Sequence, residues 1–234
     1  QKSLRENLLD TFNKLFEEKS ISFKKKLSYS TPNRLVIVFE GLQKKIVLKA
    51  EEIKGPNINA PEIALEGFMR SNNIIKKDLF RKKTDKGEFY YFKIKSQKIN
   101  THDLLEKSVP VVLQRIQWKK SMKWGEFDLN WGRPLKSILA LFDKKKLTFK
   151  FHHLTSSNST FVDKEFEEKK KIFTNFKDYN NFFKKLDIII DQNQRKNLIE
   201  KRLNEITKKR NITIKKNLKL IDEVVDLTDQ PNVI

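Results

Sequence analysis

Apolar positions along the chain follow a helical period in some segments and an extended period in others. Apolar residues return every three or four positions from Leu4 to Phe16, which predicts an amphipathic helix. The same period, with Pro61, Thr101 and Asp191 at suitable starting positions, predicts further helices. The predicted helices span about residues 4–16, 61–69, 101–113, 173–183, 191–210 and 218–227, with Pro110 kinking or breaking the third.

Short runs of β-branched and aromatic residues predict strands between these helices. Residues 35–39 form a continuous apolar run, and residues 46–48 are their predicted partner across a turn at Gly41. Gly87 can supply the positive φ that a hairpin within residues 81–95 needs. The other predicted extended segments are a half-buried strand at 127–131, a hairpin joining 138–142 to 147–151, and a short strand at 188–190.

This order of elements predicts an α+β fold of antiparallel β-hairpins packed with helices, followed by a helical extension. We expect an α+β domain over residues 1–190 and the start of a truncated helical domain over residues 191–234. No predicted helix ends neatly at the last residue, so we expect the full protein to continue beyond it.

The chain is strongly basic, with 50 Lys and Arg against 30 Asp and Glu and a formal net charge of +20. A polyanion partner fits this charge because lysine and arginine release counterions from phosphates. A chain rich in Lys, Asn, Ile and Phe can also carry lysine at any exposed position, so charge alone leaves both interpretations open. The absence of cysteine excludes disulfides and thiolate metal sites. We expect no metal site, no membrane span and a cytoplasmic location.

Candidate catalytic groups are few. The six glycines are scattered, so no phosphate-binding loop is predicted. His102 stands at a polar helix start, where a surface residue is a better interpretation than a base. Glu165, Glu167 and Glu168 could act as paired carboxylates, but three lysines follow them directly, which favours a solvated helix face. We therefore predict no catalytic residue in this chain.

Several short motifs, in this order, resemble the beta subunit of the bacterial two-subunit glycyl-tRNA synthetase. They are Tyr29-Ser30-Thr31-Pro32-Asn33-Arg34-Leu35, Lys54-Gly55-Pro56, Ala64-Leu65-Glu66-Gly67-Phe68-Met69-Arg70, Thr84-Asp85-Lys86-Gly87-Glu88, Met122-Lys123-Trp124-Gly125 with Arg133-Pro134, Asp191-Gln192-Asn193-Gln194-Arg195 and Glu223-Val224-Val225-Asp226-Leu227. Each motif is weak alone, but their common order over nearly the whole chain makes chance agreement difficult. The resemblance implies the N-terminal third of that subunit.

The sequence departs from the family at two places. Residues 156–161, Ser-Ser-Asn-Ser-Thr-Phe, stand where the family usually has Thr-x-Gly-His-Arg-Phe. Asn33 stands where the family prefers arginine. Any role of an imidazole or guanidinium in the first segment is therefore in doubt here.

The resemblance implies a subunit of glycine–tRNA ligase whose alpha subunit holds the class II site that uses ATP, with Mg, and glycine. It further implies tRNA(Gly) and a second beta subunit as partners in an alpha2-beta2 tetramer, an editing-type fold, and no cofactor bound by this region. The candidate tRNA contacts are Arg34, Arg70, Lys123 and Arg133, as basic residues near turns. We expect Trp124 to pack in the core, and Lys123 and Arg133 to belong to a structural or interface element.

Two other functions are open. A free-standing basic RNA-binding module would need an exposed aromatic sheet face, for which residues 89–92 are the candidate. Its side chains alternate between faces, so at most two of the four could stack on bases. A hydrolase that edits mischarged tRNA is disfavoured by the lost Gly-His-Arg segment.

Overall fold

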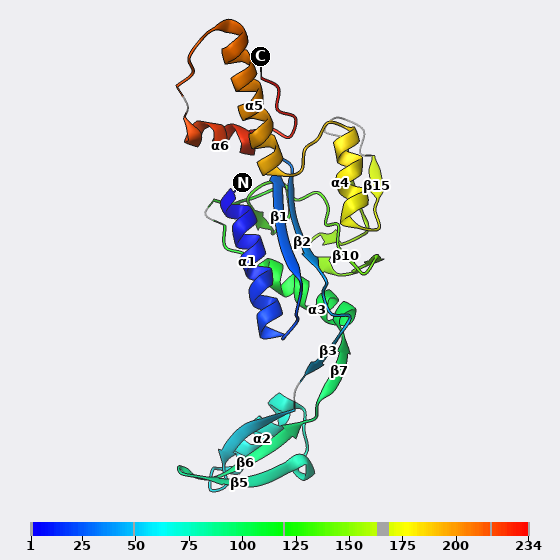
Figure 1. Cartoon of the computed structure of the whole chain (residues 1–234). Helices are drawn as coiled ribbons and strands as arrows, with labels where there is room; N and C mark the ends of the chain where they lie inside the picture. The colour runs from blue at the N-terminus through cyan, green and yellow to red at the C-terminus, as the bar shows by residue number, and fades with distance from the viewer. Residues whose placement is uncertain (1, 49, 119, 163–168, 216, 234) are drawn as a thin grey trace. The chain divides into compact units, whose positions relative to one another are not determined.

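The computed structural model describes residues 2–48, 50–118, 120–162, 169–215 and 217–233 (Figure 1). It confirms an α+β fold of helices and small antiparallel sheets. The chain divides into a main unit, Gln1–Lys44 with Thr101–Ile234, and an inserted unit, Lys45–Asn100. This insertion was not predicted from the sequence, and the boundary expected after residue 190 stays a prediction.

The main unit holds five helices and ten strands among its described residues. The helices are α1 (Lys2–Glu18), α3 (Thr101–Gln114), α4 (Phe176–Lys185), α5 (Gln192–Arg210) and α6 (Leu218–Leu227). The strands are β1 (Lys25–Thr31), β2 (Arg34–Glu40), β8 (Met122–Lys123), β9 (Asn130–Trp131), β10 (Leu141–Phe142), β11 (Lys145–Lys146), β12 (Lys150–Phe151), β13 (Leu154–Thr155), β14 (Ser159–Phe161) and β15 (Lys170–Ile172).

The long β1–β2 hairpin is the central element of the main unit. Its register pairs Thr31 with Arg34, so the turn contains only Pro32 and Asn33. Helix α1 lies along this hairpin (Figure 1), and the Phe16 ring meets the Phe39 ring edge-on at 4.6 Å between centroids. The strand at 35–39 is therefore confirmed, but its predicted partner at 46–48 is wrong. That segment pairs with residues 97–99 in the inserted unit instead.

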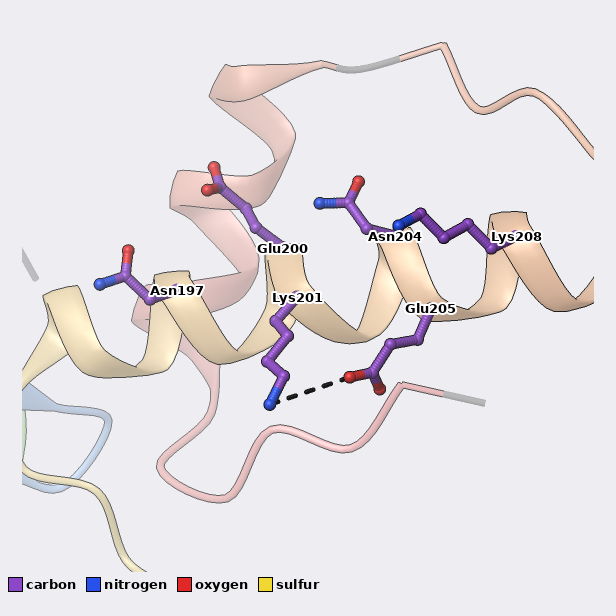
Figure 2. A pocket seen from close by; sticks show the side chains of 6 residues that line it. All are labelled: Asn197, Glu200, Lys201, Asn204, Glu205 and Lys208. Carbon is purple, nitrogen blue, oxygen red and sulfur yellow. Dashed lines mark ion pairs between the residues drawn. The ribbon is translucent and has the colours of Figure 1, made fainter.

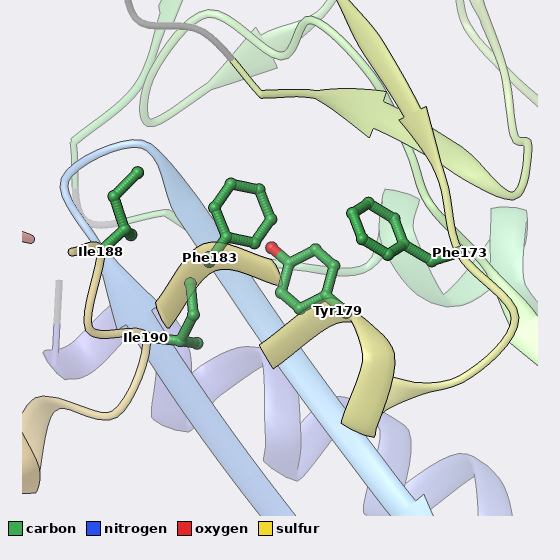
Figure 3. Close-up of a cluster of buried hydrophobic side chains, with 5 residues drawn as sticks. All are labelled: Phe173, Tyr179, Phe183, Ile188 and Ile190. Carbon is green, nitrogen blue, oxygen red and sulfur yellow. The ribbon is translucent and has the colours of Figure 1, made fainter. Parts of the chain in front are cut away.

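The segment predicted as a helix over residues 173–183 contributes aromatic side chains to a hydrophobic core. The buried side chains are Phe173, Tyr179, Phe183, Ile188 and Ile190 (Figure 3). Asn175 begins α4 by accepting a hydrogen bond from the Asp178 amide at 2.9 Å. The predicted strand at 188–190 is wrong, because this segment joins no β-ladder and the Ile189 amide donates to the Asp229 carbonyl at 2.9 Å.

Three further predictions need adjustment. The hairpin predicted from 138 to 151 is shorter, because Asp143 and Lys144 both have positive φ and turn the chain within two residues. The strand predicted at 127–131 is reduced to β9. Helix α3 begins at Thr101, as predicted, and continues past Pro110 instead of breaking there. The Thr101 side chain is buried, and its hydroxyl donates to the Gln43 carbonyl at 2.5 Å.

The inserted unit contains β3 (Lys45–Leu48), β4 (Glu51–Asn57), α2 (Glu62–Asn72), a 3-10 turn η1 (Lys76–Asp78), β5 (Leu79–Thr84), β6 (Gly87–Ile94) and β7 (Gln97–Asn100). Strands β4, β6 and β5 form one antiparallel sheet, and the predicted hairpin is its β5–β6 pair with Gly87 at φ 112°. Helix α2 packs on one face through Phe68 and Phe92, whose rings lie 5.8 Å apart. A Cβ at Gly55 would approach Phe68 Cε1 to 2.7 Å, so a side chain there would displace the Phe68 ring.

Within the described ranges, none of the helices combines the length and apolar character that crossing a bilayer requires.

Candidate nucleic-acid interface

Three of the sequence motifs meet at one buried arginine in the main unit. Arg195, in the first turn of α5, has no exposed surface. Its guanidinium donates to the carbonyls of Ser30 at 2.7 Å, Ile189 at 2.6 Å, Ile190 at 3.0 Å and Val225 at 3.1 Å. The motifs around residues 30, 195 and 225 are therefore joined by one side chain.

Ser30 collects further hydrogen bonds at the same place. Arg5 from α1 donates to the Ser30 hydroxyl at 2.7 Å. The Ser30 amide donates to Gln192 Oε1 at 3.3 Å. Burial lowers the pKa of Arg195, and the charges of Asp226, Asp229 and Asp191 oppose that shift. This group of contacts holds the backbone of β1, of the 189–190 segment and of α6 together.

Sequence reasoning included Arg195 in a motif but did not assign it this role. The available signal was an arginine four residues after the helix-capping Asp191, next to apolar segments. Arg5 gave no such signal, because an arginine in an amphipathic helix usually lies on the solvent side.

Arg34, the first candidate tRNA contact, packs against the hydrophobic core through the Phe183 ring. Its guanidinium carbon lies 4.2 Å from the centre of the Phe183 ring, and Nη2 donates to the Phe161 carbonyl at 3.3 Å. Burial raises the pKa of Tyr179 to about 12, while the charge of Arg34 acts in the opposite direction. The position expected to be exposed near a turn is half-buried, because it opens β2 facing the core.

The Trp124-Gly125 and Arg133-Pro134 motif surrounds the β8–β9 hairpin. Trp124 Nε1 donates to the Trp131 carbonyl at 2.9 Å, and Gly125 has a φ of 65°, which favours glycine. Trp131 is buried against Trp118 and Phe151, with ring centroids 4.3 Å and 5.6 Å away. Trp124 is half-buried and bonds across the hairpin, whereas the core position expected for it is taken by Trp131.

Lys123 ends β8, Arg133 follows the end of β9 by two residues, and both lie exposed. Lys123 Nζ lies 2.7 Å from Asp128 Oδ1, and this contact lowers the pKa of Asp128. Within the described ranges, the side chain of Arg133 has no hydrogen-bond or ionic partner. Phe127, which lies between Lys123 and Arg133 in sequence, is exposed. Its ring stacks on the His153 ring with 3.6 Å between centroids.

Arg70 lies in the last turn of α2 in the inserted unit and is exposed. The four candidates therefore do not form one group. Lys123 lies in the β8–β9 hairpin and Arg133 just after it, Arg34 packs on the core residue Phe183, and Arg70 belongs to the other unit. The β8–β9 hairpin is the place where the structure gathers exposed basic side chains predicted as contacts.

The segment that departs from the family pattern is held by hydroxyl groups. Ser156 is buried, and its Oγ donates to the Leu147 carbonyl at 2.7 Å and accepts from the Phe149 amide at 2.8 Å. The Thr160 and Ser137 hydroxyls lie 3.0 Å apart. The carboxylates at Glu165, Glu167 and Glu168 lie outside the described residues.

Other candidate sites offer little chemistry. His102 is half-buried, with Nε2 3.0 Å from the Lys146 carbonyl. In the described part of the chain, no three His, Asp or Glu side chains are grouped as metal ligands. A pocket of about 440 Å³ is lined by α5 side chains alone, with Lys201 and Glu205 paired at 3.9 Å (Figure 2). One helix face supplies all of its polar groups, and no predicted site residue lies in it.

Comparison with known proteins agrees with the motifs. Residues 1–234 match the family described as glycyl-tRNA synthetase beta subunit. The chain is 35% identical over 234 residues to the glycine–tRNA ligase beta subunit of Rickettsia prowazekii, and 34% identical over 236 residues to that of Rickettsia felis. Both comparisons cover 100% of this chain and 35% of the relative's length.

The family match and the motifs thus define a tRNA synthetase-related protein with an α+β fold. More particularly, the chain belongs to the glycyl-tRNA synthetase beta subunit family. It spans about a third of the length of the curated relatives it matches.

Proposed function

We propose that this chain is a region of a glycine–tRNA ligase beta subunit that supports tRNA binding and glycyl transfer, with the chemistry performed by an alpha subunit. The observation that carries the proposal is the family match over all 234 residues. The roles found for Ser30, Arg195 and Trp124 support it, because these motif residues make contacts that stabilise the fold.

The β8–β9 hairpin is the proposed tRNA contact of the main unit. Lys123 lies in a hairpin that Trp124 and Trp131 fix in place, and Arg133 follows it directly. A rigid support helps a side chain meet a phosphate. The pairing of Lys123 with Asp128 is compatible with this role, because a surface ion pair is weak and can exchange for a phosphate.

The partners in this proposal are the alpha subunit, tRNA(Gly) and a second beta subunit in an alpha2-beta2 enzyme. ATP, with Mg, acts in the alpha subunit, and the described residues are assigned no cofactor. The proposed location is the cytoplasm, where tRNA is charged.

Aminoacylation tests the proposal. The beta subunit containing this region is added to its alpha subunit, and glycylation of tRNA(Gly) is measured. We expect glycylation to depend on the beta subunit and to fall with Lys123→Ala/Arg133→Ala. The same double variant should lower the salt slope of tRNA binding by roughly 1.4–1.8, about 0.7–0.9 for each lost phosphate contact.

The matched control is Lys208→Ala/Arg210→Ala, which removes the same two residue types from the exposed last turn of α5. It should retain more of the salt slope than the hairpin variant. A beta subunit that does not stimulate glycylation would refute the proposed function. RNA binding without stimulation would favour a free-standing RNA-binding module.

A further inference from the structure

The sheet of the inserted unit has one face covered by α2 and a second face of different composition. Phe92 points towards Phe68 of α2, so its neighbour Tyr91 points to the opposite side. Cross-strand register places Lys54 and Phe80 beside Tyr91, and Lys82 beside Phe89, on this second face. We call it the aromatic-basic face; its residues are Glu52, Lys54, Phe80, Lys82, Phe89, Tyr91 and Lys93.

The aromatic-basic face is accessible. Phe80 is 37% exposed, and Lys54, Lys82 and Lys93 are exposed, whereas Leu65 and Phe92 on the side of α2 are buried. Phe89 is half-buried, and Tyr91 lies beneath its neighbours as the centre of the group.

The rings and cations of this face are interleaved. Lys54 Nζ lies 3.5 Å from the centre of the Phe89 ring, and Lys82 Nζ lies 5.6 Å from that of Tyr91. The Phe80 and Tyr91 rings are offset-stacked, with centroids 6.0 Å apart and planes 30° apart. Lys82 also reaches across β6 to Glu52, with an N–O distance of 2.7 Å. These exposed contacts are weak, so each lysine can leave its present partner and bind a phosphate instead.

Charge indicates which molecule fits this face. Residues 45–100 contain 13 Lys and Arg against seven Asp and Glu, a formal net charge of +6. Flat rings between lysines match the bases and phosphates of an unpaired nucleic-acid strand, since every base has a π-face that can stack. A duplex matches poorly, because its bases are stacked on one another and unavailable to a sheet.

We propose that the aromatic-basic face binds an unpaired RNA segment. Bases stack on Phe80 and Phe89, while Lys54, Lys82 and Lys93 contact the phosphates. Glu52 opposes binding, because it is the one carboxylate on this face and holds Lys82. The proposal rests on the proposed function only for the identity of the RNA, which would be an unpaired part of a tRNA.

The test uses the 234-residue chain and a fluorescein-labelled 12-nucleotide RNA without internal pairing, with the corresponding 12-base-pair RNA duplex for comparison. Binding is measured by anisotropy at several salt concentrations. The wild-type chain should bind the single strand more tightly than the duplex. Phe80→Leu/Phe89→Leu keeps apolar side chains but removes the rings, and it should weaken single-strand binding roughly 5- to 50-fold. Phe80→Tyr, which retains a ring, should bind like the wild type.

The lysines and the glutamate give a second readout. Lys54→Gln/Lys82→Gln should lower the single-strand salt slope by roughly 1.4, about 0.7 per phosphate contact. Lys76→Gln/Lys77→Gln changes two exposed lysines of η1 by the same charge and should lower the slope less. Glu52→Gln should tighten binding, because it releases Lys82. Circular dichroism checks that every variant is folded.

Equal binding of single strand and duplex, or unchanged binding by the folded Phe80→Leu/Phe89→Leu variant, would overturn this inference. Either result would leave the glycylation test untouched. Conversely, ring-dependent single-strand binding together with a beta subunit that does not stimulate glycylation would sustain the inference and refute the proposed function.

Discussion

Three arginines of the main unit and two lysines of the inserted unit have opposite roles. In the main unit, Arg5, Arg34 and Arg195 lie in buried or half-buried positions and donate to hydroxyl or carbonyl oxygens. In the inserted unit, Lys54 and Lys82 lie on an exposed sheet, over aromatic rings. The difference follows from side-chain chemistry. A planar guanidinium can satisfy several carbonyls at once, whereas an ammonium on a flexible stem remains hydrated.

The net charge of +20 is therefore a poor measure of the positive surface that RNA could contact. A part of the positive charge stabilises backbone connections and is unavailable to a polyanion. Charge counted over the whole chain therefore overstates the surface that RNA could use. Position within each unit is more informative than the sum.

The largest expected effect is at Arg195. Arg195→Met leaves the carbonyls of Ser30, Ile189, Ile190 and Val225 without their charged donor, and should lower the free energy of unfolding by about 3–5 kcal/mol. Urea denaturation measures it. Arg210→Met, at the exposed end of the same helix, should change stability by less than about 0.5 kcal/mol. Similar values for the two variants would contradict the structural role of the buried arginine.

A second expected effect concerns Tyr179, which lies in the same core as Arg34. Its pKa is about 12 because burial favours the neutral phenol, against about 10 in an unfolded chain. This contribution to stability is fully present below pH 10 and is lost as the pH rises from 10 to 12, by about 2–3 kcal/mol.

Alkaline denaturation of the wild type and Tyr179→Phe measures this loss. The wild type should lose more stability than the variant across that pH range, since lysine ionisation is common to both proteins. Parallel pH profiles would mean that the fold does not suppress ionisation of this phenol.

Local patterns in the sequence predicted the helices well. Residues 218–227 form α6 as expected, and Asp191 begins α5 by accepting from the Asn193 amide at 2.8 Å. One core region contains Phe173, Phe176, Tyr179, Phe182 and Phe183. Their spacing along α4 and the segment before it places the aromatic rings on one side of the helix. These features depend on interactions between residues close in sequence.

Features that depend on distant pairing were missed. The inserted unit is closed by Ile46 and Ile99, whose pairing no local pattern reveals. β1 was missed because Lys25–Thr31 is polar and alternates only weakly, although it pairs with β2 over seven residues.

The 188–190 segment has strand-like residues, but its carbonyls at Ile189 and Ile190 accept hydrogen bonds from Arg195 and do not pair with another strand. Of the candidate contacts, Arg34 was misjudged in exposure for the same reason, since Phe183 lies 149 positions further along the chain.

The smallest expected effect is on stability at Lys82. Its ion pair with Glu52 lies on the surface, where Coulomb attraction is screened and side-chain ordering opposes it. We therefore expect Lys82→Gln to leave the urea midpoint unchanged within experimental error, although it removes a 2.7 Å contact. A clear loss of stability would place Lys82 with the arginines of the main unit, as a structural group. An unchanged midpoint together with weaker binding of single-stranded RNA would separate the two roles, because a residue that does not stabilise the fold can still contribute to binding.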